Sequence, residues 1–314
     1  MKLLTVILNY KTADMTLKAA DSAVTALNHF TDDWQLTIVD NDSQDGSYDI
    51  IKREISRKKD THWQKVNVVE SGQNGGFGAG NNFAIRPALD ANPPPEYIYI
   101  LNSDAFPDLT AIEILVEHLD NHQQTGIAGS YIYGIDNVPH PTAFRFPTIY
   151  SEIESAVGVG AVSRLLDNYV VSMGIPEATR KVDWLAGASM MFKSSMLRQV
   201  GLFDEKFFLY FEETDLCKRA LGMGWETVYV KESKVAHIGS VSTGRNEWQR
   251  IPEYWLDSRK YYFCKNHGRA YNGVATVAKL LGGLVWQIKR RVQKRPDVTP
   301  PYFLVDLLKH WIKN

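Results

Sequence analysis

Hydrophobic and polar positions alternate with two different periods along the first 132 residues. Short runs rich in β-branched and aromatic residues predict strands at Leu3–Leu8, Leu36–Val39, Val66–Val69, Tyr97–Leu101 and Ile127–Ile132. Longer stretches with apolar residues at helical spacing predict helices at Met15–Phe30, Ser47–Lys58, Gly80–Leu89 and Leu109–His122. Strands that alternate with helices are typical of right-handed crossovers. The pattern therefore predicts an α/β fold with a mostly parallel sheet and helices on both faces.

This alternation ends after Ile132. We expect a loop at Tyr133–Pro147, a helix at Ser151–Leu166 and an irregular, mobile segment at Asp167–Val182. Regular elements then return, and the predicted ones are a strand at Trp184–Phe192, helices at Ser194–Val200 and Glu212–Leu221, and a strand at Glu226–Val230. From Pro252 onward the pattern is mostly helical, which predicts a C-terminal helical extension.

Polar residues follow the first four predicted strands at the point where each strand ends. Asn9-Tyr10 follows the first strand, Asp40-Asn41-Asp42 the second and Asn102-Ser103-Asp104 the fourth. The third strand runs into Glu70–Asn74 and then into a glycine-rich run from Gly75 to Asn82. Ligands of such sheets collect at the carboxyl ends of the strands. We therefore expect all four clusters to line one crevice.

The two strand-end aspartates have a functional and a structural interpretation. Asp40 can accept hydrogen bonds from a ribose hydroxyl or a base N–H, or it can form a turn that caps the next helix. Ser43, Asp45, Gly46 and Ser47 can supply that cap, which would leave Asp40 free. Asp104 suits a hard cation that bridges two phosphates, and its structural alternative is again a turn.

The glycine-rich run does not match the dinucleotide-binding fingerprint. The spacing Gly76-x-Gly78-x-x-Asn81 lacks the third glycine, and the first strand–helix turn contains no glycine. A nicotinamide-dependent oxidoreductase is therefore disfavoured. The glycines can still bring backbone N–H groups close to a ligand, with Asn81 and Asn82 adding side-chain hydrogen bonds. A flexible turn is the structural alternative.

The stretch Phe203–Leu216 combines many aromatic residues with several acids. The aromatic residues can form an apolar wall for a sugar, and one carboxylate can act as general base on an acceptor hydroxyl. The structural alternative is that acids complement the dipole in a first helical turn. His237 can complete a metal shell or contact phosphate, although a lone histidine is more often structural.

Composition narrows the classes of protein further. The chain has 314 residues, 44% of them hydrophobic, and a net charge of −1, so no strong global field indicates a nucleic-acid partner. Cys217 and Cys264 alone cannot build a disulfide framework or a four-cysteine zinc site. The N-terminal apolar run predicts a buried strand rather than a signal peptide, and no stretch of 18 apolar residues occurs. A cytoplasmic location is expected.

Taken together, these residues resemble the family-two inverting glycosyltransferases of the GT-A fold, in particular bacterial rhamnosyltransferase-like members. The resemblance extends over roughly residues 3–267. The matching segments are Val6–Tyr10, Val39–Ser43, Asn74–Asn81, Leu101–Asp104, Trp184–Ala188, Phe203–Glu205 with Phe207-Phe208, Tyr210–Leu216, and His237 with Gly239. Each segment is weak alone, but their order is highly specific.

The resemblance implies three groups of site residues. The group around the nucleotide would be Asn9, Asp40, Asn41, Asp42, Asn74, Gly76, Asn81 and Ser103. Asp104 and His237 would hold Mg²⁺ or Mn²⁺ on the diphosphate of the donor. The sugar and acceptor pocket would be lined by Trp184, Gly187, Ala188 and Tyr210.

Two departures from the family pattern bear on the chemistry. Asn102 stands where many relatives have the first aspartate of a DxD motif, so metal binding would rest on fewer charges. The pair Glu212-Glu213 replaces the more usual Glu-Asp. Glu213 aligns with the expected catalytic base, and Glu212 and Asp215 stay open as alternatives.

The function that the resemblance implies is inverting transfer of a sugar from a nucleoside-diphosphate donor of dTDP or UDP type. Rhamnose is the candidate sugar, and the acceptor would be a glycan or lipid-linked glycan in bacterial surface polysaccharide synthesis. Residues 1–132 would form the nucleotide-sugar-binding half and residues 133–250 the acceptor-binding and catalytic half of the same domain, with residues 251–314 as the helical region. A non-catalytic nucleotide-sugar-binding protein is the alternative.

One helical stripe lies beyond the resemblance. Its apolar members recur at steps of three and four and are Val274, Val277, Leu281, Leu284 and Ile288. Positive charge lies nearby at Lys279, Lys289, Arg290, Arg291, Lys294 and Arg295. The helix either packs on the catalytic domain or on a second subunit of a homodimer, or residues 272–295 bind anionic lipid. If residues 272–295 bind lipid, the protein would be peripheral at the inner face of the cell membrane.

Overall fold

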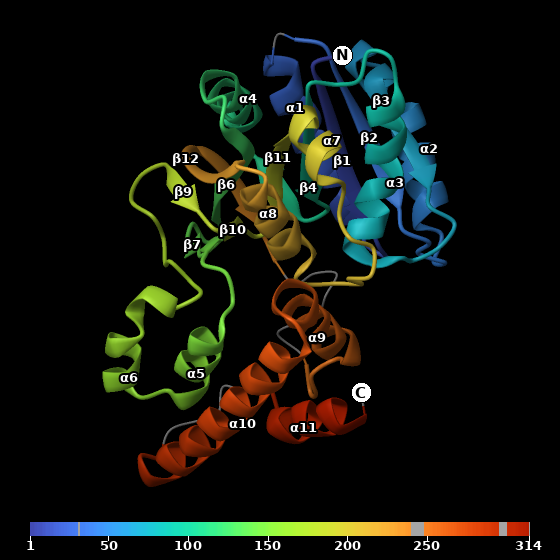
Figure 1. Cartoon of the computed structure of the whole chain (residues 1–314). Coiled ribbons are helices and arrows are strands. Elements are labelled where there is room, and N and C mark those ends of the chain that lie inside the picture. Colours follow the sequence, from blue (N-terminus) through green and yellow to red (C-terminus); the bar gives the residue numbers. More distant parts are fainter. Residues whose placement is uncertain (31, 240–247, 295–299, 314) are drawn as a thin grey trace. The chain divides into compact units, whose positions relative to one another are not determined.

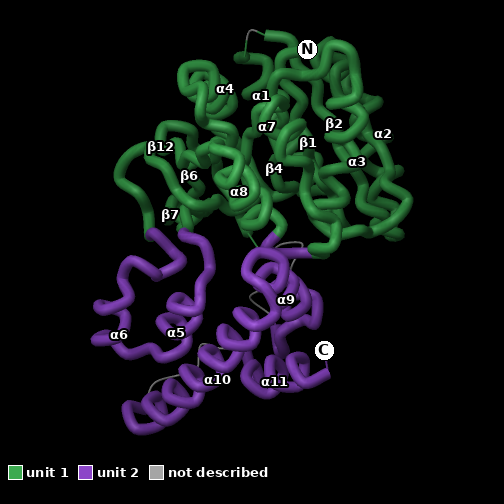
Figure 2. The backbone as a smooth tube through the Cα atoms, in the orientation of Figure 1, with its two compact units in different colours: residues 1–144, 174–208, 212–243 green, residues 145–173, 209–211, 244–314 purple. Residues whose placement is uncertain are grey.

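The computed structural model describes residues 1–30, 32–239, 248–294 and 300–313, and it divides into two compact units (Figure 2). The first unit comprises Met1–Phe144, Gly174–Phe208 and Glu212–Thr243, and the second comprises Arg145–Met173, Leu209–Phe211 and Gly244–Asn314. Arg295 of the predicted basic group lies outside the described residues.

The first unit is built on a mixed sheet with the strand order β3-β2-β1-β4-β11-β6-β12-β5 (Figure 1). Its strands are β1 (Leu3–Asn9), β2 (Trp34–Asp40), β3 (Val66–Glu70), β4 (Tyr97–Asn102), β5 (Ala105–Pro107), β6 (Thr125–Tyr133), β11 (Ser189–Lys193) and β12 (Glu226–His237). The short strands β7 (Pro139–His140) and β9 (Arg180–Val182) pair with β6 and β12. All five strands predicted in the first 132 residues are confirmed.

Strands β3, β2, β1 and β4 run parallel, whereas β11 is antiparallel to both of its neighbours. The central parallel strands β1 and β4 are almost entirely buried because both faces of the sheet are covered. Leu3, Val6 and Ile7 of β1 and Leu36 and Ile38 of β2, for example, are fully buried. The carboxyl ends of β1, β2 and β4 consequently lie at one edge of the sheet.

Helices cover both faces of this sheet (Figure 1). On one face α1 (Ala13–His29) packs against α2 (Ser47–Arg57) and α4 (Ala111–Asn121). On the other, α8 (Glu212–Gly222) packs against α3 (Gly76–Asp90) and α7 (Ser194–Val200). A short 3₁₀ helix, η1 (Thr61–Lys65), precedes β3. The predicted architecture of a sheet between two helical layers is therefore confirmed.

The second unit is helical. It contains α5 (Ile149–Val157), α6 (Gly160–Leu165), η2 (Asp167–Tyr169), α9 (Glu253–His267), α10 (Arg269–Val292) and α11 (Phe303–Lys313). A buried ion pair ties α9 to α5, with 2.7 Å between Nη2 of Arg259 and Oε2 of Glu152. The predicted C-terminal helical extension is confirmed. None of the helices in the described ranges is both long enough and apolar enough to cross a membrane.

Several predicted boundaries are wrong. The predicted strand Trp184–Phe192 is two strands, because β10 (Trp184–Leu185) leaves the main sheet to pair with β8 (Ala143–Phe144). The predicted loop after Ile132 accordingly contains β7 and β8. The single helix predicted at Ser151–Leu166 is divided at Gly158, which has a left-handed backbone with φ of 57°. Helix α3 begins at Gly76 rather than at Gly80.

Candidate functional site

The predicted strand-end clusters share one edge of the sheet. Asn9 of β1 is in register with Asp40 of β2, and the preceding residue Leu8 is in register with Asn102 of β4. Glu70, the last residue of β3, is in register with Asp40 on its other side. Hydrogen bonds between side chains then connect these strand ends to one another.

Asp40 is the most completely hydrogen-bonded carboxylate of this edge. It is buried, and its Oδ2 accepts from Nδ2 of Asn9 at 2.6 Å and from Oγ of Ser43 at 2.7 Å. Its Oδ1 accepts from the backbone N–H of Ser43 at 2.9 Å. The expectation that Asp40 stays free is therefore wrong, because a carboxylate at a buried strand end needs internal donors. The N-cap of α2 is Gly46, which has a left-handed backbone, and Oδ1 of the preceding Asp45 accepts from the N–H of Ser47 at 3.0 Å.

Two threonines that the sequence analysis missed extend the network toward β4. Thr16 donates to Oδ1 of Asn9 at 2.6 Å, and the hydroxyl of Thr12 lies 3.2 Å from the same oxygen. Thr12 also lies 3.2 Å from Oγ of Ser103, which follows β4. The available signal was the spacing of four residues, which places both threonines on the helix face directed at the sheet edge.

A second amide network connects the ends of β2 and β3. Nδ2 of Asn41 donates to Oδ1 of Asn74 at 3.0 Å and to the carbonyl of Gly76 at 3.2 Å. Oδ1 of Asn74 also accepts from the N–H of Gly76 at 3.1 Å. Asp42 differs from these residues, since it is half-buried, has a left-handed backbone with φ of 58° and contacts Gln44.

The glycine-rich run serves packing within the chain. Gly76 has φ of 87°, and a Cβ atom there would lie 1.8 Å from the carbonyl oxygen of Phe208. That oxygen accepts a hydrogen bond from the N–H of Phe77 at 2.9 Å. One of the backbone N–H groups at the start of α3 is therefore already bonded within the chain. Asn81 and Asn82, which we expected to bond a ligand, both have hydrogen-bond partners within the chain. Asn81 donates to the carbonyl of Phe77, and the amide of Asn82 pairs with both backbone groups of Phe203.

Asp104 and His237 are brought together as predicted, with 3.0 Å between Oδ1 and Nε2. Oδ2 of Asp104 accepts from the N–H of Gly239 at 3.1 Å, and the amide of Asn102 lies 3.4 Å from the His237 ring. Burial raises the pKa of Asp104, but the hydrogen bonds from His237 and Gly239 outweigh burial and hold this pKa below its ordinary value.

The donors around Asp104 fit one kind of cation site. Within the described residues no group of three or more histidine, cysteine, aspartate and glutamate side chains could enclose a metal ion. Mg²⁺ and similar hard cations are often held by one or two protein ligands together with substrate phosphates and water. Asp104 and His237 fit a cation shared with a diphosphate, and they do not fit a closed structural site.

Helix α8 begins with two glutamates of unusual environment. Oε2 of Glu212 and Oε2 of Glu213 are buried, and neither has a hydrogen-bond partner in the described part of the chain. Burial raises the pKa of Glu213 to about 7, opposed by hydrogen bonds from backbone N–H groups that include Gly187. Burial and the neighbouring Glu213 raise the pKa of Glu212 well above its ordinary value. Both carboxyl groups therefore resist ionisation.

Asp215, the third acid of this helix, has a different environment. Its Oδ2 accepts from Nε of Arg219 at 2.7 Å, and the side chain is fully buried. The two Nη atoms of Arg219 donate to the carbonyls of Val200 and Leu202 at 2.7 Å each. Asp215 thus fixes an arginine that holds the segment after α7.

Adjacent residues connect the acid pair to the Asp104 cluster. Glu213 is bonded to Gly187, and the next residue, Ala188, accepts the N–H of Asn102 on its carbonyl at 3.0 Å. The amide of Asn102 then faces His237. The turn between β10 and β11 therefore places Glu213 and the end of β4 on either side of two small residues.

The remaining predicted pocket residues separate into different places. Trp184 stacks on Phe144 with ring centroids 4.3 Å apart, and Ala188 is buried in the hydrophobic core. Tyr210 belongs to the second unit, where its ring lies 5.8 Å from that of Trp248 and 6.4 Å from that of Tyr254. Tyr210 has a left-handed backbone with φ of 70°.

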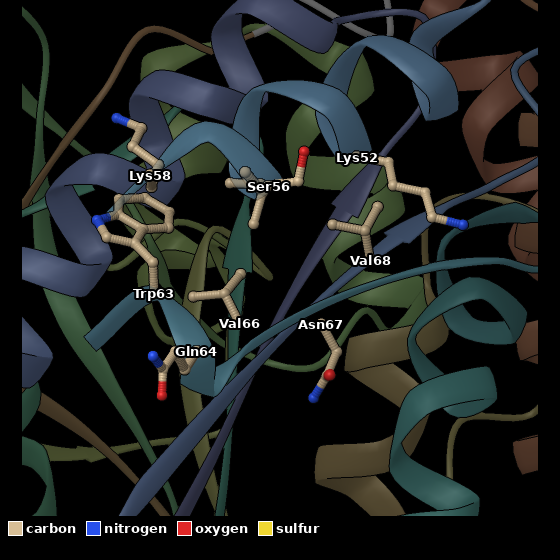
Figure 3. Close-up of a pocket in the computed structure, with 9 residues that line it drawn as sticks. Lys52, Ser56, Lys58, Trp63, Gln64, Val66, Asn67 and Val68 are labelled. Carbon is tan, nitrogen blue, oxygen red and sulfur yellow. The ribbon is translucent and has the colours of Figure 1, made fainter. Parts of the chain in front are cut away.

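A separate hollow of about 330 Å³ lies between α2, η1 and β3, and residues such as Lys52, Trp63 and Asn67 line it (Figure 3). It is formed at the first residues of β3 and involves Val66 and Val68, whereas Glu70 at the other end of the strand is in register with Asp40. None of the predicted site residues lines it.

Known proteins resemble the chain in sequence. Residues 5–158 match the family model described as Glycosyl transferase family 2. N-acetylglucosaminyl-diphospho-decaprenol L-rhamnosyltransferase of Mycobacterium tuberculosis is 28% identical over 191 residues, which cover 59% of this chain. The chain spans 62% of the length of that relative. The low-salt glycan biosynthesis hexosyltransferase Agl10 of Haloferax volcanii is 25% identical over 265 residues, covering 83% of this chain and 74% of that protein.

The fold also resembles solved structures. The mannosyltransferase PcManGT from Pyrobaculum calidifontis, in complex with GDP-Man and Mn²⁺, matches with a TM-score of 0.57 and 12% sequence identity. The match covers 99% of this chain and 79% of that structure. This likeness confirms the GT-A fold that the sequence motifs predicted.

Proposed function

We propose that this chain, which belongs to glycosyl transferase family 2, transfers a sugar from a nucleoside-diphosphate donor to a hydroxyl group with inversion of configuration. The observation that carries the proposal is the carboxylate of Glu213. Its Oε2 is buried without a partner in the described residues, and its pKa is raised to about 7. A general base works best when its pKa lies near the operating pH.

The chemical step follows from this placement. The carboxylate of Glu213 takes the proton of the acceptor hydroxyl, whose oxygen bonds to the anomeric carbon from the face opposite the leaving group. The bond between that carbon and the phosphate oxygen breaks, and the nucleoside diphosphate leaves with the electron pair. Glu213 is favoured over Asp215 because Arg219 already neutralises Asp215. It is favoured over Glu212 because the pKa of Glu212 is raised well above the ordinary value beside Glu213.

For the donor, we propose that the hydrogen-bonded strand ends form a preorganised cradle. Asp40, Asn9 and Asn41 hold its shape, because their polar atoms already bond one another. The half-buried residues Asp42 and Asn74 are the better candidates for direct contact with the nucleoside. Gly76, Asn81 and Ser103 complete the same cradle. We propose a dTDP or UDP donor that carries rhamnose, and the name of the mycobacterial relative supports rhamnose as the sugar.

Asp104 and His237 would hold Mg²⁺ or Mn²⁺, and Mn²⁺ is the ion named with the mannosyltransferase structure. When bound, such an ion offsets the negative charge that develops on the leaving diphosphate. We propose Trp184, Gly187 and Ala188 for the sugar side of the site. Residues 1–132 then serve the donor, residues 133–250 the acceptor and catalysis, and residues 251–314 form the helical region.

The acceptor that we propose is a glycan or lipid-linked glycan in bacterial surface polysaccharide synthesis, and a lipid-linked acceptor would be reached at the inner face of the cell membrane. The test is a thermal-shift screen of nucleotide sugars with and without Mn²⁺, followed by an assay of nucleoside-diphosphate release from the donor that stabilises the protein most. We expect one donor to stabilise the protein and to be turned over. If the best-binding donor releases no nucleoside diphosphate, either to an added acceptor or to water, sugar transfer is contradicted. The alternative of a non-catalytic nucleotide-sugar-binding protein is then supported.

A further inference from the structure

Helix α10 presents its large apolar side chains to solvent. Seven of them lie between 39% and 79% exposed, and they are Val274, Val277, Leu281, Leu284, Val285, Ile288 and Val292. At 100° per residue these seven positions fall within about a quarter to a third of the helix circumference. They therefore form one continuous stripe, called here the α10 stripe, along nearly the whole helix of 24 residues.

The opposite side of α10 makes the packing contacts of the second unit. Its buried residues are small or polar and are Asn272, Ala275, Thr276, Gly282 and Gly283. A Cβ on Gly282 would lie 2.7 Å from Cβ of Ala156 in α5, and one on Gly283 would lie 2.4 Å from Leu304 of α11. Packing on α5 and α11 thus requires glycine on the inner side. The helix buries its small side and exposes its large aliphatic side, which is the reverse of an ordinary surface helix.

Positive charge borders the α10 stripe. The helix contains no aspartate or glutamate, and its charged residues are Arg269, Lys279, Lys289, Arg290 and Arg291. Lys289 follows Ile288 and Arg291 precedes Val292, so each lies about 100° around the helix from that apolar neighbour, on opposite sides of the stripe. Cationic residues that flank an apolar helix face are typical of helices that lie in the interface of an anionic bilayer.

A neighbouring helix, α11, also exposes apolar side chains. In α11, Val305, Leu308 and Ile312 recur at steps of three and four and are 46%, 41% and 74% exposed. Trp311 of the same helix is 38% exposed, and α11 packs against α10. Tryptophan is enriched where a protein meets the headgroup region of a bilayer.

We propose that the α10 stripe is a docking surface for an anionic phospholipid bilayer, on which α10 lies parallel to the membrane plane. The aliphatic side chains enter the acyl boundary, and the exposed Arg291 and Lys294 contact lipid phosphates, whereas Lys289 donates to the carbonyl of Gly158. A second copy of the chain fits this surface less well. In a two-fold symmetric contact the same patch meets itself, and α10 carries no acid to pair with its own basic residues.

The test is co-sedimentation of the full-length protein with vesicles, which does not depend on the proposed sugar transfer. Vesicles of equal parts phosphatidylcholine and phosphatidylglycerol are compared with vesicles of phosphatidylcholine alone. Wild type should bind the anionic vesicles and leave the neutral ones largely unbound. The double substitution Leu281→Gln with Ile288→Gln should lower the partition coefficient at least about ten-fold, because two buried aliphatic chains are lost.

The matched control is Leu109→Gln with Met223→Gln in the first unit. These two side chains are 52% and 65% exposed, close to the 59% and 64% of Leu281 and Ile288. Its binding should equal that of wild type. Arg291→Glu with Lys294→Glu should weaken anionic binding about 25-fold or more, whereas Lys18→Glu with Lys59→Glu should change it far less. Because all these side chains are exposed, thermal melting should stay that of wild type.

Three results would contradict the proposal. One is equal vesicle binding by the stripe variant and its matched control. Another is a wild-type protein that sediments as a dimer without lipid and becomes monomeric in the stripe variant, which would assign the stripe to a second copy. Binding to neutral and anionic vesicles alike would contradict the role of the basic borders.

Discussion

Two acidic regions of the first unit differ in how their carboxylates are satisfied. Asp40 at the end of β2 accepts three hydrogen bonds from Asn9 and Ser43. At the start of α8, the Oε2 atoms of Glu212 and Glu213 are buried, and the described residues offer no partner to either. Both regions lie in the first unit, yet Asp40 has hydrogen-bond donors for both of its oxygens, whereas Glu212 and Glu213 each have a buried oxygen without one.

This difference separates structural from chemical roles. A buried carboxylate with several donors is stabilised as an anion and holds the strand ends in place. A buried carboxylate with an oxygen that lacks a donor has a raised pKa and is stabilised when it accepts a proton. We therefore expect substitutions at Asp40 to act mainly on stability and donor binding, and substitutions at Glu213 to act on turnover.

The largest effect is expected at Glu213. Glu213→Gln keeps the size of the side chain and removes the base, so the rate of transfer should fall about 100- to 10,000-fold while donor affinity stays nearly unchanged. Single-turnover kinetics measure the rate of transfer, and calorimetry measures donor affinity. Glu117→Gln, on the exposed side of α4, is the matched control and should retain the wild-type rate. Normal turnover of Glu213→Gln with saturating donor would refute its assignment as base.

The second prediction concerns stability against pH. The pKa of Glu213 rises from its ordinary 4.5 to about 7 on folding, so the folded protein holds this proton more tightly than the unfolded chain. Its contribution is fully present below pH 4.5 and is lost as pH rises through 7. At about 1.4 kcal/mol for each pH unit between these values, the loss amounts to about 3 kcal/mol.

Urea titrations of wild type and Glu213→Gln between pH 4.5 and 8 measure this change in the free energy of unfolding. The wild-type value should fall relative to that of the variant across this range. A constant difference between the two proteins would show that Glu213 is already ionised throughout and would contradict the contrast with Asp40.

The third prediction tests the contact that connects the glycine run to the segment before the acid pair. Gly76→Ala should destabilise the protein by about 2–3 kcal/mol, because the new Cβ would meet the Phe208 carbonyl and the backbone is left-handed. Gly72→Ala is the matched control, since Gly72 also has positive φ but open space around it, and it should cost about 1 kcal/mol. If urea titrations show that both substitutions lower the free energy of unfolding equally, the Phe208 carbonyl is not what requires glycine at position 76.

The smallest predicted effect is at Asp40. Asp40→Asn places an NH₂ group opposite the donors of Asn9 and Ser43, which should cost about 2 kcal/mol in the free energy of unfolding. Asp42→Asn should cost less than about 0.5 kcal/mol, because Asp42 is only half-buried. Chemical denaturation of both variants measures the difference. Similar stabilities would mean that the internal hydrogen bonds of Asp40 contribute little.

The sequence predicted those parts of the fold that depend on local patterns. Apolar runs such as Leu3–Leu8 identify strands because both faces of a parallel sheet are buried. The sequence also predicted that Asp104 and His237 share one site. Their separation in the chain is bridged by β5 and β12, whose pairing sets His237 opposite Ala105.

Other features depend on contacts that no local pattern encodes. The internal partners of Asp40 arise from Asn9 on a neighbouring strand, and the carbonyl that requires glycine at 76 comes from Phe208. The period of α10 predicted its apolar stripe correctly. It could not predict that Gly282 and Gly283 on the opposite side would take the packing contacts.

The central claim is that a base with a pKa near 7 controls the chemical step. The most direct measurement is the rate of nucleoside-diphosphate release against pH for wild type, with the donor identified by thermal shift. Because Glu213 must be deprotonated to act, kcat/KM should rise with pH, about ten-fold per unit at low pH, and level off above about 7. A rate that stays constant between pH 5 and 8 would contradict Glu213 as the base.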